Sequence, residues 1–144
     1  MTVAAILRHK GSDVVSISGG ETLAGVSQLL TERRIGAVLV HMGDNPLAGI
    51  LSERDIVHAL AKYGAEALKL TAVEVMTREP QTVTPTTSVV EAMAIMTSGR
   101  VRHLPVMSEG KVIGLVSIGD VVKARIAQHE AEMEGLLAYV SDAG

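Results

Sequence analysis

The feature that most constrains this sequence is an internal repeat. Two segments align with each other, ETLAGVSQLLTERRIGAVLV and TSVVEAMAIMTSGRVRHLPV, so that Thr22 meets Ser88 and Arg34 meets Arg100. Further along the chain GILSERDIV aligns with GLVSIGDVV, and the Gly, Ser and Asp of both segments coincide. Self-similarity of this kind is typical of a supersecondary unit that needs a second copy to bury its apolar face.

Each copy predicts the same order of elements. A short strand (VVSI or QTVT) leads to an amphipathic helix, with Thr22 or Ser88 as the N-cap. Two strands follow in each copy, AVLV with LAGIL and LPVM with VIGLV, and the turn-forming sequences GDNP and SEG join them. A second helix is expected to start at Ser52 in the first copy and at Ser117 in the second.

A β-α-β-β-α unit cannot cover its own sheet, so the two copies are expected to pack sheet against sheet as a pseudo-twofold disc. The predicted fold class is α+β (α/β). We place the first repeat at residues 1–70, the second at 71–126 and a C-terminal helical extension at 127–144.

The extension is predicted because an apolar stripe continues beyond the second repeat. Its members fall at alternating steps of four and three residues: Val122, Ile126, His129, Met133, Leu136 and Val140. Such a helix either packs on the core of its own chain or forms the seam of a dimer.

Composition excludes several classes of partner. A hydrophobic content of 47% in 144 residues is enough for a buried core, whereas a formal net charge of −3 without runs of Lys or Arg offers no footprint for nucleic acid or an anionic membrane. With no Phe or Trp and only two Tyr, the chain lacks the usual platforms for base stacking.

The chain has no Cys, which excludes disulfides and thiolate sites. No stretch approaches the roughly 20 apolar residues of a membrane span, and the N-terminal apolar run is too short for a secretory signal. These features favour a cytoplasmic protein.

A Ser-x-x-Asp sequence opens the last helix of each copy, as Ser52 with Asp55 and as Ser117 with Asp120. This spacing is the capping-box pattern, in which each side chain accepts a hydrogen bond from an otherwise unpaired backbone N–H. Taken alone, the pattern predicts only the start of a helix.

Together these motifs resemble the tandem cystathionine β-synthase-type (CBS) domain pair, or Bateman module. The resemblance runs from about Val3 to Arg125 and rests on TVTPTTSVVEAM, on VRHLPV, on the EVMT lead-in and on the Ser-x-x-Asp ending of both copies. More narrowly, the chain is similar to the small stand-alone bacterial CBS-pair proteins related to hypoxic response proteins.

The resemblance implies that the Ser and Asp lie at the rim of a cleft between the copies, where the carboxylate accepts hydrogen bonds from the ribose hydroxyls of an adenine nucleotide. Each site is then shared between the copies. The first site, called here the basic site, comprises Ser52, Arg54 and Asp55 with Thr82, Val83, Thr84, Val101, Arg102, His103 and Pro105. The second site comprises Ser117 and Asp120 with Ile17, Ser18, Ile35, Gly36 and Ala37.

The two sites differ in charge. Arg102 and His103 can hold a phosphate in the basic site, because Arg supplies a fork of donors and a protonated His adds charge. At the matching positions the second site has Gly36 and Ala37, so it is predicted to lack a phosphate cradle. The alternative is that Arg102 and His103 only form a solvated strand edge.

Neither a metal site nor catalysis is expected. The other histidines, His9, His41, His58 and His129, show no ligand spacing with His103. Ser117, His103 and Asp120 have the residue types of a triad, but the sequence supplies no oxyanion hole and no nucleophile elbow.

The resemblance therefore implies a regulatory module that binds an adenine nucleotide without catalysis, with AMP or NAD the first candidates and ADP, ATP or S-adenosylmethionine as others. A homodimer is expected, together with a possible protein target. The alternative function is a ligand-free scaffold for dimerisation or for docking on a partner.

Overall fold

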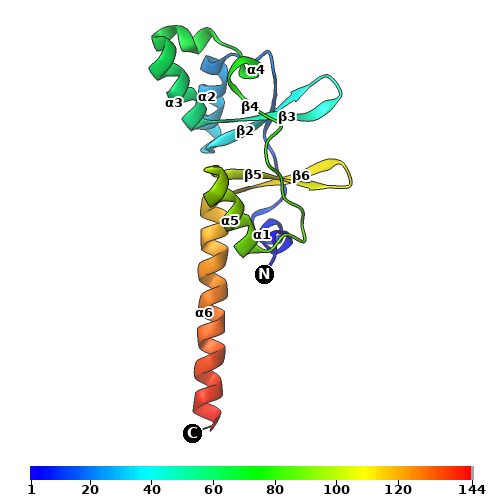
Figure 1. Cartoon of the computed structure of the whole chain (residues 1–144), viewed down its shortest axis with the longest axis vertical. Coiled ribbons are helices and arrows are strands. Elements are labelled where there is room, and N and C mark those ends of the chain that lie inside the picture. Colours follow the sequence, from blue (N-terminus) through cyan, green and yellow to red (C-terminus); the bar gives the residue numbers. More distant parts are fainter. Residues whose placement is uncertain (144) are drawn as a thin grey trace. The chain divides into compact units, whose positions relative to one another are not determined.

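The computed structural model describes residues 1–143. The chain forms two compact units. One, here the central unit, is Asp13–Gln81, and the other, the terminal unit, combines Met1–Ser12 with Thr82–Gly144. Figure 1 labels most of the elements of both units.

The central unit is built around a four-stranded sheet. Its elements in chain order are β1 (Ser16–Ser18), α2 (Leu23–Arg33), β2 (Ala37–Met42), β3 (Asn45–Ser52), α3 (Glu53–Tyr63), the 3-10 helix η1 (Gly64–Lys69), α4 (Ala72–Val75) and β4 (Thr77–Arg78). The strand order is β1-β2-β3-β4, with β1 parallel to β2 and the other neighbours antiparallel.

The terminal unit has a smaller sheet. Its elements are α1 (Val3–Lys10), α5 (Val89–Gly99), β5 (His103–Ser108), β6 (Lys111–Ser117) and α6 (Ile118–Ala143). The strands β5 and β6 form an antiparallel hairpin, and Val83 adds an isolated parallel bridge to Val106. None of the described helices is long and apolar enough to cross a membrane.

Each unit has its own aliphatic core. The largest buried side chains of the central unit include Leu23, Val26, Val38, Val40 and Leu51. Those of the terminal unit include Val3, Val89, Leu104, Val106 and Val116. Burying each such side chain contributes about 1.5–3 kcal/mol, so these clusters are the main source of stability.

The N-caps predicted for the first helix of each repeat are confirmed. The Thr22 hydroxyl caps α2 by accepting a hydrogen bond from the Gly25 amide at 3.2 Å, and the Ser88 hydroxyl caps α5 in the same way. At the other ends, Arg34 and Arg100 adopt left-handed φ angles of 55° and 53° that terminate α2 and α5. The aligned arginines therefore occupy equivalent positions in the backbone.

The short helix that precedes each repeat packs with the other repeat. The helix α4 lies in the central unit, where the Ala72 amide donates to the Glu21 carbonyl at 2.8 Å. The helix α1 lies in the terminal unit, where the Val3 amide donates to the Thr87 carbonyl, also at 2.8 Å. The sequence repeats and the compact units therefore do not coincide, because the two lead-in helices are exchanged.

Equivalent glycines allow the exchanged segments to come close to the strands. A Cβ on Gly114 of β6 would lie 2.7 Å from Cδ2 of Leu7 in α1. A Cβ on Gly49 of β3 would lie 2.7 Å from the backbone oxygen of Thr77 and 2.8 Å from Cγ of Met76. This shared close approach explains why the repeat has glycine at both positions.

Two of the predicted strands are shorter than expected, and one strand was not expected. The VVSI strand begins only at Ser16, and QTVT is reduced to the bridge at Val83. The latter cannot extend because the Thr84 amide donates to the Thr87 hydroxyl at 3.1 Å and Pro85, which follows, has no amide hydrogen. The strand β4 pairs with β3 although its own two residues carry no strand signal.

Candidate functional site

The two Ser-x-x-Asp sequences form equivalent reciprocal caps. In the central unit the Ser52 amide donates to Oδ2 of Asp55 at 2.8 Å, and the Asp55 amide donates to the Ser52 hydroxyl at 3.4 Å. In the terminal unit the corresponding distances for Ser117 and Asp120 are 2.8 and 3.2 Å. The capping role of both pairs is confirmed, and it fixes each carboxylate at the first turn of its helix.

Strand pairing places a short loop beside each cap. In the central unit Ala37 pairs with Ser52, and the Glu53 amide donates to the Gly36 carbonyl at 2.9 Å. These contacts hold the end of β2 next to the start of α3. A main-chain segment and a capping carboxylate are thus brought to one end of the sheet.

The terminal unit repeats this arrangement with different side chains. His103 pairs with Ser117, and the Ile118 amide donates to the Arg102 carbonyl at 2.8 Å. Arg102 and His103 therefore occupy the positions that Gly36 and Ala37 occupy in the central unit. The alignment on which the charge difference was predicted is structurally sound.

The carboxylate of Asp120 has a cationic partner. Nζ of Lys10 lies 2.7 Å from its Oδ2 and also donates to the Leu115 carbonyl at 2.9 Å. Burial raises the pKa of Asp120, but the hydrogen bond from Lys10, the amide of Ser117 and the charge of Lys10 together outweigh it, so the pKa lies below its usual value. Asp120 is therefore held as a carboxylate in an ion pair that is only partly exposed.

Asp55 differs from Asp120 in this respect. Its Oδ2 accepts from both the amide and the hydroxyl of Ser52, at 2.8 and 3.0 Å. Within the described central unit no Lys or Arg nitrogen lies within 4.0 Å of this carboxylate, and Oδ1 accepts no hydrogen bond from that unit. The two matched carboxylates thus have different surroundings inside their own units.

Lys10 was missed by the sequence analysis. The second site was predicted to lack a phosphate cradle, since its positions matching Arg102 and His103 are uncharged, yet Lys10 places an ammonium beside Asp120. Lys10 lies in HKGS, four residues that only the first copy has at this point. That insertion was the available signal, but its packing in the terminal unit follows from the exchange of α1.

The predicted site residues differ in how far their side chains are exposed to solvent. Buried side chains are Ile17, Ala37, Val83 and Pro105. The half-buried group comprises Ser52, Asp55, Ile35, Gly36, Val101, His103, Ser117 and Asp120. The exposed group comprises Ser18, Arg54, Thr82, Thr84 and Arg102.

Val83 is a core residue, and its backbone polar groups are not available to a ligand. Its side chain is 3% exposed, its amide donates to the Pro105 carbonyl at 3.0 Å and its carbonyl accepts from the Met107 amide at 2.8 Å. Because both backbone groups are paired, the polar groups of this strand come from the exposed flanking residues Thr82 and Thr84. Each predicted site draws on both units, and the structure describes each group within its own unit.

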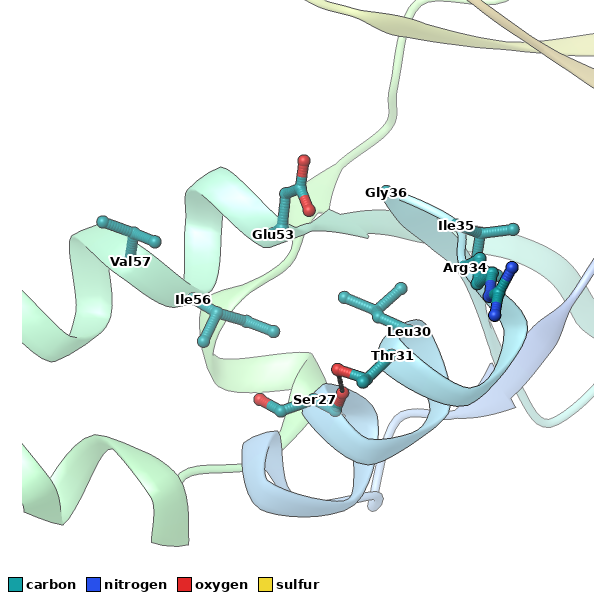
Figure 2. Close-up of a pocket in the computed structure, with 9 residues that line it drawn as sticks. All are labelled: Ser27, Leu30, Thr31, Arg34, Ile35, Gly36, Glu53, Ile56 and Val57. Atoms are coloured by element: carbon teal, nitrogen blue, oxygen red, sulfur yellow. Dashed lines mark hydrogen bonds between the residues drawn. The ribbon is translucent and has the colours of Figure 1, made fainter.

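The central unit also has a cavity of about 490 Å³ between α2 and α3. Figure 2 shows its lining: Ser27, Leu30, Thr31, Arg34, Ile35, Gly36, Glu53, Ile56 and Val57. Ile35 and Gly36 are the only predicted site residues in this lining, and Arg34 and Glu53 add one charge of each sign. This cavity therefore overlaps the second predicted site at Ile35 and Gly36 and includes no residue of the basic site.

Among the described residues, no group of three or more His, Asp or Glu side chains is arranged to hold a metal ion.

The chain matches the CBS domain family model twice, over residues 3–62 and 72–127. It is 35% identical over 147 residues to the CBS domain-containing protein CBSX3, mitochondrial, of Arabidopsis thaliana, covering 96% of this chain and 71% of that protein. It is 32% identical to CBSCBSPB2 of Arabidopsis thaliana, of which it spans only 23%.

Solved structures show the same fold. A CBS-domain containing protein from Agrobacterium tumefaciens is 38% identical with a TM-score of 0.84, covering 87% of this chain and 99% of that one. A CBS domain protein from Pyrobaculum aerophilum, complexed with AMP, is 28% identical with a TM-score of 0.73, covering 83% and 89%.

Hypoxic Response Protein I, solved with two coordinated zinc ions, is 29% identical with a TM-score of 0.69, covering 86% of this chain and 98% of that one. The resemblance predicted from the repeated motifs is confirmed. With both matches in one chain, in order and over nearly its whole length, the protein belongs to the CBS domain family as a tandem CBS pair.

Proposed function

We propose that this tandem CBS pair is a regulatory module that binds an adenine nucleotide, with AMP as the first candidate, and that it catalyses no reaction. Family membership supports the regulatory role. The AMP complex of the Pyrobaculum aerophilum relative supports the class of ligand. ADP, ATP, NAD and S-adenosylmethionine are the other ligands to be compared with AMP.

The observation that carries the proposal is the state of Asp55. The reciprocal cap with Ser52 holds its carboxylate in place through Oδ2, while Oδ1 accepts no hydrogen bond from the described central unit. A carboxylate fixed in this way can accept hydrogen bonds from two adjacent ribose hydroxyls. The N-terminus of the 11-residue helix α3 adds a favourable field for a phosphate.

Arg102 is the proposed partner of the phosphate. Its carbonyl is fixed by the Ile118 amide, while its side chain is exposed. A guanidinium binds phosphate oxygens through charge-assisted, often bidentate hydrogen bonds. In this proposal the members of the basic site act together, with Asp55 on the ribose and Arg102, with His103 beside it, on the phosphate.

The two sites are proposed to be unequal. Asp120 is already paired with Lys10, so a ribose would have to displace or share that ammonium. We therefore assign the stronger binding to the site of Asp55. Lys10 could supply the second site with a phosphate contact once its bond to Asp120 is released.

Regulation requires that the ligand bind two arrangements of the protein with unequal affinity. We propose a homodimer as the regulated assembly, acting on a protein target, and the cytoplasmic location stays a prediction. A ligand-free scaffold is the second candidate, because the exposed apolar stripe of α6 offers an interaction surface without any nucleotide.

The test is thermal unfolding with AMP, ADP, ATP, NAD and S-adenosylmethionine, each added separately. A ligand at a hundredfold excess over its Kd stabilises the native state by about 2.7 kcal/mol. Asp55→Ala should abolish this stabilisation, whereas Asp44→Ala, which removes the same charge from the β2-β3 turn, should retain it. No shift with any of these ligands at millimolar concentration contradicts nucleotide binding and favours the scaffold.

A second comparison locates the phosphate. Arg102→Ala should weaken AMP binding and leave adenosine binding nearly unchanged, because only the charge-assisted contact is lost. Arg8→Ala, an exposed arginine of α1, is the matched control. Equal losses for AMP and adenosine in Arg102→Ala would show that the phosphate lies elsewhere.

A further inference from the structure

The helix α6 continues well beyond the unit that supports it. Val121 is fully buried, and Ala124, Arg125 and Gln128 are part-buried, so one face of its first half packs on the terminal unit. From residue 129 to residue 141 every side chain is exposed. Figure 1 shows this second half, orange to red, extending away from α5 and the β5-β6 hairpin. An unsupported helix of this length is marginal in water, so it needs a partner.

The exposed half is not uniformly polar. Apolar residues follow the heptad positions a and d, with Val122, His129 and Leu136 at d and Ile126, Met133 and Val140 at a. The exposed fractions of the five apolar members are 39% for Val122, 54% for Ile126, 50% for Met133, 58% for Leu136 and 58% for Val140. We call these six residues the α6 stripe.

The α6 stripe lies on a different face from the one that packs in the terminal unit. At 3.6 residues per turn, its centre is displaced roughly 125° around the helix from the face of Val121, Ala124 and Gln128. The core of the terminal unit therefore leaves the stripe open along its whole length. The stripe begins at Val122, next to the buried Val121. An interface formed by the stripe would therefore start at the terminal unit and run along α6 without a break.

We propose that the α6 stripe is the seam of a parallel, in-register coiled coil between two copies of this chain. This inference rests on the proposed homodimer and adds to it the interface and the relative orientation of the two α6 helices. It does not depend on nucleotide binding. A second copy is the occupant because a heptad stripe is self-complementary: each a or d residue meets the same residue of the partner.

The charges beside the seam select the parallel orientation. In a parallel pair, Arg125 at position g faces the partner subunit's Glu130 at position e, and twofold symmetry makes this attraction twice. The antiparallel pair that uses the whole stripe instead brings Glu130 against the partner's Glu130 and Glu132 against the partner's Glu132. Like charges at such positions are destabilising, so the parallel arrangement is favoured.

The residues within the seam also fit two strands. β-branched residues at a with leucine at d favour a parallel dimer, and Ile126, Val140 and Leu136 satisfy that rule. His129 is the one polar member. A polar residue in a coiled-coil seam lowers stability and fixes the register, because every shifted alignment would place it against an apolar layer.

The first test is the mass in solution, measured by sedimentation equilibrium on the full chain. The wild type should have the mass of two 15.1 kDa chains. Met133→Glu should have the mass of one chain, since it buries a charge in the seam. Ala131→Glu adds the same charge on the opposite face of the helix and should remain a dimer. His129→Leu should lower the dissociation constant by about tenfold or more.

The second test measures the orientation of the two helices by disulfide formation. Because the chain has no Cys, any disulfide must involve the introduced residue. Leu136→Cys should form an intermolecular disulfide on mild oxidation, because parallel chains bring the two substituted positions together at one d layer. In the full-overlap antiparallel pair these positions are roughly 15 Å apart along the axis, beyond the ~7 Å Cα separation a disulfide can bridge. Ala131→Cys, on the outer face, should remain unlinked.

The outcomes separate this inference from the proposed homodimer. A Met133→Glu protein that stays dimeric overturns the α6 seam while the homodimer stands on another surface. A monomeric wild type overturns both. A dimer that Met133→Glu dissociates but Leu136→Cys fails to link keeps the seam and overturns its parallel orientation.

Discussion

Nζ of Lys10 lies 2.7 Å from Oδ2 of Asp120, and this contact joins residues 110 positions apart in the sequence. It connects the end of α1 to the first turn of α6. It also distinguishes Asp120 from Asp55, the matched carboxylate of the other repeat, which has no Lys or Arg partner within its own described unit. The same structural motif is thus used in two electrostatic settings.

The ion pair predicts an acid-dependent contribution to stability. The pKa of Asp120 is lower in the folded state than in the unfolded chain, so the carboxylate binds fewer protons when folded. Its contribution is therefore complete above the unfolded value of about 3.9 and is lost as the pH falls through the lower folded value. Lys10→Met should flatten this acid limb, measured as the free energy of unfolding in urea at successive pH values.

Lys69→Met is the control for that measurement. Lys69 lies 3.5 Å from Glu66, but both side chains are largely exposed, at 79% and 75%. Exposed pairs contribute little, so this variant should follow the wild-type curve. An unchanged acid limb in Lys10→Met would show that the Ser117 cap alone keeps the Asp120 carboxylate ionised.

The glycines at the exchanged helices should differ in their tolerance of alanine. Gly49→Ala should lower the free energy of unfolding by roughly 1–3 kcal/mol, because its Cβ meets the backbone of Thr77, which is held in β4. Gly114→Ala should be milder, since its Cβ meets only the flexible end of Leu7. Denaturant titration checks the order, and reversed losses would show that α1 is held more rigidly than β4.

The spectrum of the purified protein tests for tight nucleotide binding. Two Tyr and no Trp make the chain a weak absorber near 280 nm, so a bound adenine would dominate the spectrum near 260 nm. Retention through purification requires a Kd of about 1 μM or better. The native sample should then show a higher 260/280 ratio than protein that has been denatured and filtered. Identical spectra would exclude tight binding and leave only weak, sensor-like binding.

Gly135 lies inside α6 and has open space beside it. Among the described residues, no atom outside the backbone of α6 itself lies within 4 Å of the position that a Cβ would take there. Gly135→Ala should therefore stabilise the helix by about 1 kcal/mol, because glycine is a poor helix former and the added methyl meets no obstacle. Circular dichroism and thermal unfolding measure the effect. A decrease in helicity would show that a second molecule covers this position.

Local patterns were sufficient to predict most of the secondary structure. The caps at Thr22 and Ser88 and the reciprocal cap at Ser52 depend only on residues three positions apart, so the sequence displays them directly. The hairpins β2-β3 and β5-β6 were predicted because turn residues separate two apolar runs. The alignment predicted that Gly36 and Ala37 match Arg102 and His103, but not that each segment lies beside the cap of its own unit. The sharing of each cap with the other repeat stays a prediction.

The exchange of α1 and α4 could not be predicted in this way. Either helix could form its internal backbone hydrogen bonds equally well beside either repeat. Which repeat it packs on depends on tertiary contacts such as that of Leu7 with Gly114. Lys10 was overlooked for the same reason, because a cation in the last turn of a helix is favourable without any distant partner. The strand β4 depends on pairing with Gly49 and Ile50 rather than on its own two residues.

The exchange of α1 has a consequence for synthesis on the ribosome. The central unit, Asp13–Gln81, is continuous in sequence and can fold as soon as it has emerged. Residues 1–12 emerge ahead of the central unit but belong to the terminal unit, so the apolar side chains of Val3 and Ile6 remain without their core until β6 and the start of α6 have been made. Residues 1–12 are thus synthesised before the central unit and are among the last to be buried, and a nascent chain halted after Gln81 would carry the central unit together with an exposed apolar segment.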